Sequence, residues 1–144
     1  EERILEGISK YDTKIIMIDH LHFLLDMKMM AGGNTSLLIG AVMRELKRMA
    51  IQYNIIIFLI AHTKQTKFLK GQMPDLTSLR DSGMVAAESD FVLFIDRKQT
   101  EDKMNWDDKS VLFLAKNRWN GQTGWVHLVF KNNKFIEEDY AHSE

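Results

Sequence analysis

The sequence predicts an α/β fold in which a mainly parallel sheet, flanked by helices, continues into antiparallel C-terminal strands. Two unbroken apolar runs, Lys14–Asp19 and Ile55–His62, are typical of strands buried on both faces. A segment of helical period separates them, and strand, helix, strand in this order favours a right-handed crossover between parallel strands. The C-terminal third carries strand patterns around the turn residues Asn120-Gly121 and Asn132-Asn133.

The elements of the N-terminal part follow from periodicity and breakers. We expect the end of a helix over residues 2–10, a strand over Lys14–Asp19, a flexible loop over residues 26–36, a helix from Thr35 or Ser36 to about Tyr53, and a second strand over Ile55–His62. The core face of the long helix is predicted to consist of Leu38, Val42, Leu46 and Met49.

The C-terminal part is expected to be richer in strands. We expect a polar loop over residues 63–76, a short helix over Met84–Ser89, a third strand over Phe91–Asp96, a charged loop over residues 97–108, and strands over Ser110–Lys116, Trp125–Phe130 and Lys134–Ile136. Trp125 lies within a strand pattern and is expected in the core.

Size and composition restrict the possible classes. The 144 residues suit one domain, 1–144, with a single core, and a net charge of −1 leaves nucleic-acid binding to local clusters of charge. The absence of cysteine excludes disulfides and thiolate metal sites. No apolar run reaches the roughly 18 residues of a membrane span and no signal-peptide pattern is present, so we expect a cytoplasmic protein. The chain begins without Met, as a fragment would.

Asp19 ends the first apolar strand, at the edge where open α/β sheets bind ligands. A carboxylate there has the pattern of a Walker B motif, whose Asp orders Mg²⁺ beside a nucleotide phosphate. Since parallel strands run side by side, His62 is expected at the same edge, where it can bond a γ-phosphate or the attacking water. The alternatives are a solvated Asp19 and a His62 bonded to backbone. A zinc site at His20 and His22 lacks further ligands and is disfavoured.

Two groups of cations are candidate phosphate ligands. The first is Lys64, Lys67 and Lys70, continued by Arg80, Asp81 and Gly83 in the stretch SLRDSG, a mixture that suits a nucleic-acid backbone. The second is Lys116 and Arg118, two apart at a strand end, which suit a triphosphate if the extended geometry continues. The alternative for both groups is ordinary solvated surface charge.

Taken in order, these pieces resemble the C-terminal motor domain of DnaB-like hexameric replicative helicases, a group that includes phage primase-helicases and Twinkle. The matching stretches, over roughly residues 12–137, are IIMIDHLHFL, RELKRMAIQYN, FLIAHTK, DLTSLRDSGMVAAESDFVLFIDR and AKNRWNGQTGWVHLVF. The histidine in IAHTK resembles the phage and Twinkle branch, because bacterial DnaB proteins carry glutamine there. The resemblance implies a RecA-like P-loop NTPase core.

The resemblance also implies roles for the candidate residues. Asp19 would be the Walker B ligand of Mg²⁺ and His62 the phosphate sensor, with ATP or another NTP as cofactor. Lys116 and Arg118 would reach the neighbouring subunit's nucleotide in a homo-hexameric ring, Arg118 as the arginine finger. The DNA-binding residues would be Lys64, Lys67, Lys70, Arg80, Asp81 and Gly83, with the loop 26–36 as a second element facing single-stranded DNA. A primase or a loader would be a further partner, and no membrane is implied.

The main departure from the family is the missing phosphate loop. No stretch reads G-x-x-x-x-G-K-[ST], and AGGNTS contains no lysine. The resemblance places that loop and the catalytic glutamate upstream of Walker B, so we expect the C-terminal part of an ATP-dependent DNA helicase, inactive by itself. The alternatives are another RecA-, RadA- or KaiC-like ATPase and a non-catalytic nucleic-acid-binding module without a phosphate loop.

Overall fold

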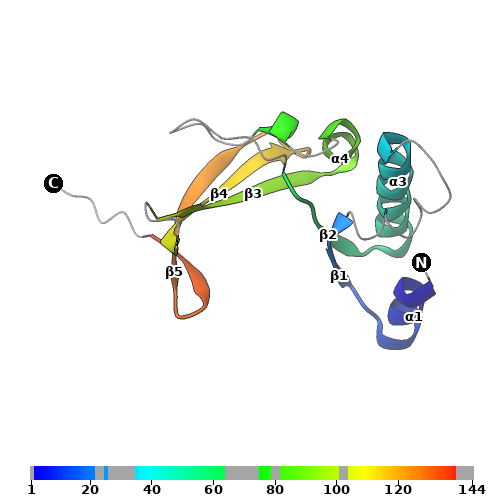
Figure 1. Cartoon of the computed structure of the whole chain (residues 1–144). Coiled ribbons are helices and arrows are strands. Elements are labelled where there is room, and N and C mark those ends of the chain that lie inside the picture. Colours follow the sequence, from blue (N-terminus) through cyan, green and yellow to red (C-terminus); the bar gives the residue numbers. More distant parts are fainter. Residues whose placement is uncertain are drawn as a thin grey trace. The chain divides into compact units, whose positions relative to one another are not determined.

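A computed structural model describes residues 2–21, 25, 35–63, 75–78, 82–100 and 104–138 (Figure 1). Their contacts divide the chain into two compact units. The first unit contains the described residues up to Thr63 and those from Asp75 to Ser89, and the second contains those from Asp90 onward. Each unit is described by itself below, and the single domain expected over residues 1–144 stays a prediction.

The first unit is built on a parallel strand pair joined by a long helix. Its elements are α1 (Glu2–Tyr11), β1 (Ile15–Asp19), α3 (Thr35–Tyr53), β2 (Ile56–Ile60), the 3₁₀ helix η1 (Leu76–Ser78) and α4 (Ser82–Glu88). β1 and β2 pair in parallel, from Ile15 opposite Ile56 to Asp19 opposite Ile60. The predicted strand–helix–strand crossover is therefore confirmed, with element ends shifted by one or two residues.

Residues in the left-handed region end the two longer helices. Asp12 follows α1 with φ 51°, and Asn54 follows α3 with φ 50°. At the end of α1, the Asp12 N–H donates to the Ile8 carbonyl at 3.1 Å and the Thr13 N–H to the Gly7 carbonyl at 3.3 Å. This pattern satisfies carbonyls that the helix leaves without a partner in its last turn. α3 thus ends at Tyr53, where the sequence predicts its end.

The buried face of α3 lies about one residue away from the predicted stripe. Val42 and Met49 are buried as expected, whereas Leu38 and Leu46 are only half-buried. The other buried positions of this helix are Ile39, Gly40 and Met43. The shift has a cause in tertiary packing, because α4 lies against α3 at Gly40: a Cβ built on this glycine would lie 2.9 Å from Cε of Met84.

The expectation that both parallel strands are covered on both faces is wrong for the described residues. Burial alternates along β1 and β2, and one side of the pair stays exposed. The apolar side chains on that side are Ile15, Met17, Ile56, Phe58 and Ile60, with exposed fractions from 47% to 75%. We call these five residues the open apolar face. An apolar run identifies a strand, but it does not show which part of a protein covers each side.

The second unit is an antiparallel sheet in the order β3-β4-β5-β6 (Figure 1). Its strands are β3 (Phe91–Gln99), β4 (Trp106–Asn117), β5 (Gly124–Lys131) and β6 (Lys134–Glu137). The third predicted strand thus pairs with β4 rather than with β1 or β2. The predicted hairpin turn is confirmed, since Asn132 and Asn133 have φ of 53° and 59°.

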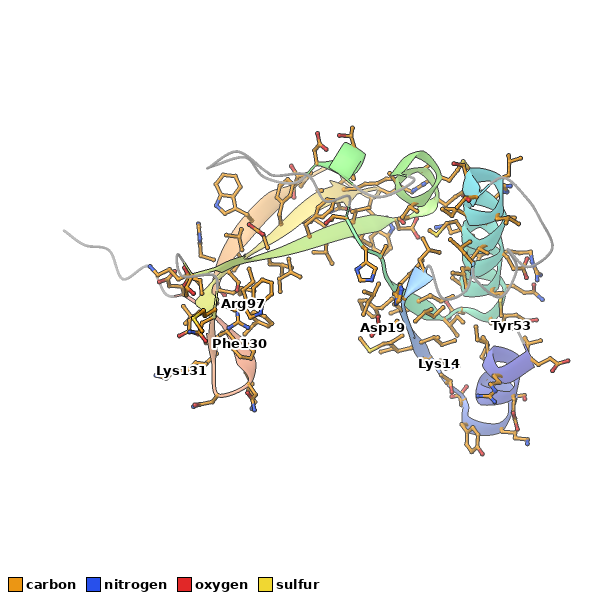
Figure 2. The ribbon with its side chains drawn as sticks, viewed as in Figure 1. Lys14, Asp19, Tyr53, Arg97, Phe130 and Lys131 are labelled. Atoms are coloured by element: carbon orange, nitrogen blue, oxygen red, sulfur yellow. The ribbon has the colours of Figure 1, made fainter. Side chains whose placement is uncertain are left out.

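Two expectations for this unit need correction. β3 and β4 extend into the predicted charged loop over residues 97–108, because Arg97 is held along the sheet rather than solvated. Its Nε donates to the Asp107 carbonyl at 2.7 Å, and its guanidinium carbon lies 4.2 Å from the Phe130 ring centre (Figure 2). Trp125, expected in the core, is 62% exposed.

Candidate functional site

Asp19 lies at the carboxyl end of the parallel strand pair. It is the last residue of β1 and stands opposite Ile60, the last residue of β2 (Figure 2). Its side chain is 75% exposed, so its carboxylate oxygens are accessible from solvent. An accessible carboxylate at this edge is the donor type that Mg²⁺ prefers. The position of Asp19 therefore suits the role that the sequence suggests.

His62 lies at the same edge, two residues beyond the end of β2, and its ring contacts that of His20. The two ring centres are 4.6 Å apart with an interplanar angle of 60°, an edge-on arrangement. Nδ1 of His20 lies 3.9 Å from Oδ1 of Asp19. His20 therefore stands in contact with both predicted site residues. Sequence reasoning considered His20 only as a metal ligand, although its position directly after Asp19 was the available signal.

Lys116 and Arg118 lie where β4 runs into a turn. Lys116 is half-buried within β4 opposite Val92, and the strand ends at Asn117. The alternation that would bring Lys116 and Arg118 to one side thus ends one residue before Arg118. Arg118 instead forms an ion pair with Asp90, with 3.3 Å between its Nε and the carboxylate Oδ1. Sequence reasoning included Asp90 in the matching stretch DLTSLRDSGMVAAESDFVLFIDR but gave it no role of its own.

Most of the predicted DNA-binding residues lie outside the described residues. These are Lys64, Lys67, Lys70, Arg80 and Asp81, together with residues 26–34 of the second expected loop. Gly83 is described: it lies in the first turn of α4 and is exposed, and a Cβ built on it would meet nothing within 4 Å. Before this segment, Oδ1 of Asp75 accepts hydrogen bonds from the N–H and hydroxyl of Thr77 at 2.9 and 2.6 Å.

A comparison with protein families identifies the chain. The family model described as "DnaB-like helicase C terminal domain" matches residues 3–137. The chain belongs to this DnaB-like family. The match includes β1 with Asp19, β2, and the turn that carries Arg118.

Curated relatives agree with the DnaB-like assignment. The replicative DNA helicase DnaB of Mycoplasma genitalium is 28% identical over 137 residues, which are 91% of this chain and 29% of the relative. A probable plasmid replicative DNA helicase of Chlamydia muridarum is 31% identical over 136 residues, 92% of this chain and 28% of that protein. The chain thus spans less than a third of the length of these relatives.

Solved structures confirm the fold class of the DnaB-like chain. The ATPase domain of G40P superposes with a TM-score of 0.71 at 22% identity, covering 96% of this chain and 49% of that one. A DnaB-like replicative helicase, studied with its primase interactions, gives a TM-score of 0.67 at 23% identity over 86% of this chain and 30% of the other. The fold is therefore α/β of the RecA-like ATPase type. No helix among the described residues is long and apolar enough to span a membrane.

Proposed function

We propose that this chain is the C-terminal portion of the motor domain of a replicative DNA helicase. The parent protein would couple NTP hydrolysis to movement along single-stranded DNA and to duplex unwinding. Membership of the DnaB-like family over residues 3–137 carries the proposal. The edge formed by Asp19, His20 and His62 supports it, because a carboxylate and an imidazole meet where α/β sheets bind ligands.

At this edge Asp19 would hold Mg²⁺, directly or through water. The exposed carboxylate fits that ion, which supplies positive charge to the phosphates of a bound nucleotide. His62 would donate a hydrogen bond to the γ-phosphate or orient the attacking water, and so report the state of the nucleotide to the segment that follows β2. The phosphate-binding lysine and glycines are not among these 144 residues, so nucleotide binding also requires other parts of the parent.

The cations of the second unit would act across a subunit boundary. We propose that Lys116 and Arg118 approach the nucleotide of the neighbouring subunit in a homo-hexameric ring, where Arg118 stabilises charge on the transferred phosphoryl group. The exposure of Arg118 at the end of β4 supports this role, because its side chain is 48% accessible.

Single-stranded DNA is the proposed track of the motor. Lys64, Lys67 and Lys70 would neutralise backbone phosphates, and Arg80, Asp81 and Gly83 would contact the same strand from the adjoining segment. Residues 26–36 would be a second element that faces the single-stranded DNA. We further propose a primase or a loader as partner, since one similar structure is that of a helicase studied with primase, and the cytoplasm as the place of action.

The decisive experiment compares nucleotide hydrolysis by the complete parent protein and by the 144-residue chain. Both would be assayed with Mg²⁺, with and without single-stranded DNA. DNA-stimulated turnover by the parent and none by the chain is the expected result. Turnover by neither, with single-strand binding intact, would instead indicate the non-catalytic binding module.

A further inference from the structure

Asp90 holds Arg118 through two separate contacts, both within the second unit. The Arg118 backbone N–H donates to the Asp90 carbonyl at 2.8 Å. The Asp90 carboxylate Oδ1 lies 3.3 Å from Nε of the same arginine. One residue directly before β3 thus engages both the main chain and the side chain of the residue directly after β4.

The residues on either side reinforce this arrangement. The Phe91 and Trp119 rings lie 5.9 Å apart, so the two residues that follow Asp90 and Arg118 also meet. Asn117 stabilises the turn itself, because its carbonyl accepts the Gly121 N–H at 2.9 Å and its side-chain Oδ1 accepts the Trp119 N–H at 3.1 Å. The start of the turn is therefore attached to the start of β3 at consecutive positions.

The contact at Nε has a geometric consequence for the guanidinium. Arginine carries five N–H donors in a planar fork, one of them on Nε and four on the two Nη atoms. A carboxylate beside Nε therefore restrains how the group can turn, and with it the directions available to both Nη atoms. A residue that stabilises a transition state depends on such placement, since small errors in position strongly reduce the rate.

We propose that Asp90 is the positioning residue of Arg118, orienting its guanidinium toward the neighbouring subunit's nucleotide. This inference rests on the proposed function, because it assigns Asp90 a role through the arginine finger. Half-exposed ion pairs contribute little to stability, and both side chains are partly solvated, at 48% for Arg118 and 38% for Asp90. A purely structural role would therefore leave the turnover rate almost unchanged.

The kinetic test uses the parent protein and a double-mutant cycle. We expect Asp90→Ala to lower kcat about 10- to 100-fold with little change in KM, and Asp90→Asn to retain more activity because its amide oxygen can still accept from Nε. Adding Asp90→Ala to Arg118→Ala should cause no further loss. Additive losses, a raised KM at unchanged kcat, or wild-type turnover in Asp90→Ala would overturn the inference.

The matched control is Asp108→Ala, which removes another ion-paired aspartate of the same sheet. Oδ1 of Asp108 lies 3.7 Å from Nη2 of Arg97, so this variant also removes one negative charge and one aspartate–arginine ion pair. We expect wild-type kcat in this variant. A loss equal to that of Asp90→Ala would attribute the effect to general damage to the sheet. If Asp90→Ala does not fold, Asp90→Leu, which has a similar size and no acceptor, carries the comparison.

A second measurement does not depend on hydrolysis. Crystal structures of the parent and of its Asp90→Ala and Asp108→Ala variants would show the direction of the Arg118 guanidinium. We expect it to turn away from its wild-type direction only in Asp90→Ala, and an unchanged guanidinium would overturn the inference. A parent without NTPase activity would refute the proposed function, while these structures would still decide whether Asp90 orients Arg118.

Discussion

The rings of His20 and His62 meet edge-on at 4.6 Å, across the carboxyl ends of two neighbouring parallel strands. His20 directly follows Asp19, the proposed Mg²⁺ ligand, so one side chain contacts both halves of the proposed nucleotide edge. The parallel register, with Asp19 opposite Ile60, produces this meeting, because it ends both strands at the same level.

Replacement of His62 should separate hydrogen bonding from bulk. In the parent, we expect His62→Ala to lower DNA-stimulated kcat about 100-fold, the loss typical of one donor to a transition state. His62→Gln should retain more activity, because its amide still donates a hydrogen bond. Steady-state hydrolysis with and without single-stranded DNA measures this, with His127→Ala on β5 as the control. Equal losses in Ala and Gln variants would argue against the sensor role.

Removal of the arginine finger should affect chemistry and leave binding intact. We expect Arg118→Ala in the parent to lower kcat by about 10³- to 10⁵-fold, leaving a measurable residual rate, while nucleotide affinity stays within about 2-fold, because an interaction made only in the transition state alters kcat. Hydrolysis assays and equilibrium binding of a non-hydrolysable nucleotide measure the two effects. Wild-type turnover in this variant would remove the assignment.

The lysines after β2 should determine how salt affects DNA binding. Each phosphate neutralised on a single strand contributes about 0.7 to the slope of log K against log salt concentration. Replacing Lys64, Lys67 and Lys70 by Ala in the parent should therefore lower that slope by about 2. Titrations of a fluorescent oligonucleotide over a range of salt concentrations measure it. An unchanged slope would locate the DNA path elsewhere.

The contact between α3 and α4 leaves little room for a side chain at Gly40. We expect Gly40→Val to reduce the free energy of unfolding by about 1 to 3 kcal/mol, because its Cβ would lie 2.9 Å from Met84 Cε and 3.3 Å from the less mobile Met84 Cγ, and its methyl groups would need further space. Ala41→Val is the control, since Ala41 is exposed on the same helix. Denaturant midpoints of the chain measure both. Equal effects of the two substitutions would contradict a packing cause.

The open apolar face predicts a difference between the chain and its parent. The chain covers only 49% of the G40P ATPase domain chain, so we expect other residues of the parent to bury Met17. Met17 is 75% exposed here, and Met17→Gln should hardly affect the stability of the chain. In the parent it should cost about 2 kcal/mol, the order of burying such a side chain. If Met17→Gln lowers the free energy of unfolding by the same small amount in the chain and in the parent, the face stays exposed to water in both.

Local signals predicted much of the fold, and tertiary contacts explain the misses. The two apolar runs located β1 and β2, and the helical period between them located α3. The expected parallel pairing of the strands then predicted that Asp19 and His62 lie at one edge. The strand ends did not reveal that His20 would contact both residues, because that depends on side-chain direction after the strand. The pairing of Asp90 with Arg118 joins positions far apart in sequence and depends on a turn that the residue pattern locates but does not orient. The buried face of α3 likewise depends on a contact between residues far apart in sequence, because Met84 of α4 packs against Gly40.

The seating of Met84 against Gly40 also has a mechanical consequence. Because Gly40 has no side chain, the Met84 side chain packs directly onto α3, and such close packing resists sliding of one helix along the other. α3 begins at the end of the stretch 26–36, and α4 begins directly after Asp81, so each helix adjoins one of the segments proposed to contact DNA. If those segments hold DNA in the parent, a displacement of either would be transmitted to the other through the packing of α3 against α4. The two DNA-contacting segments would then move together along the strand rather than independently.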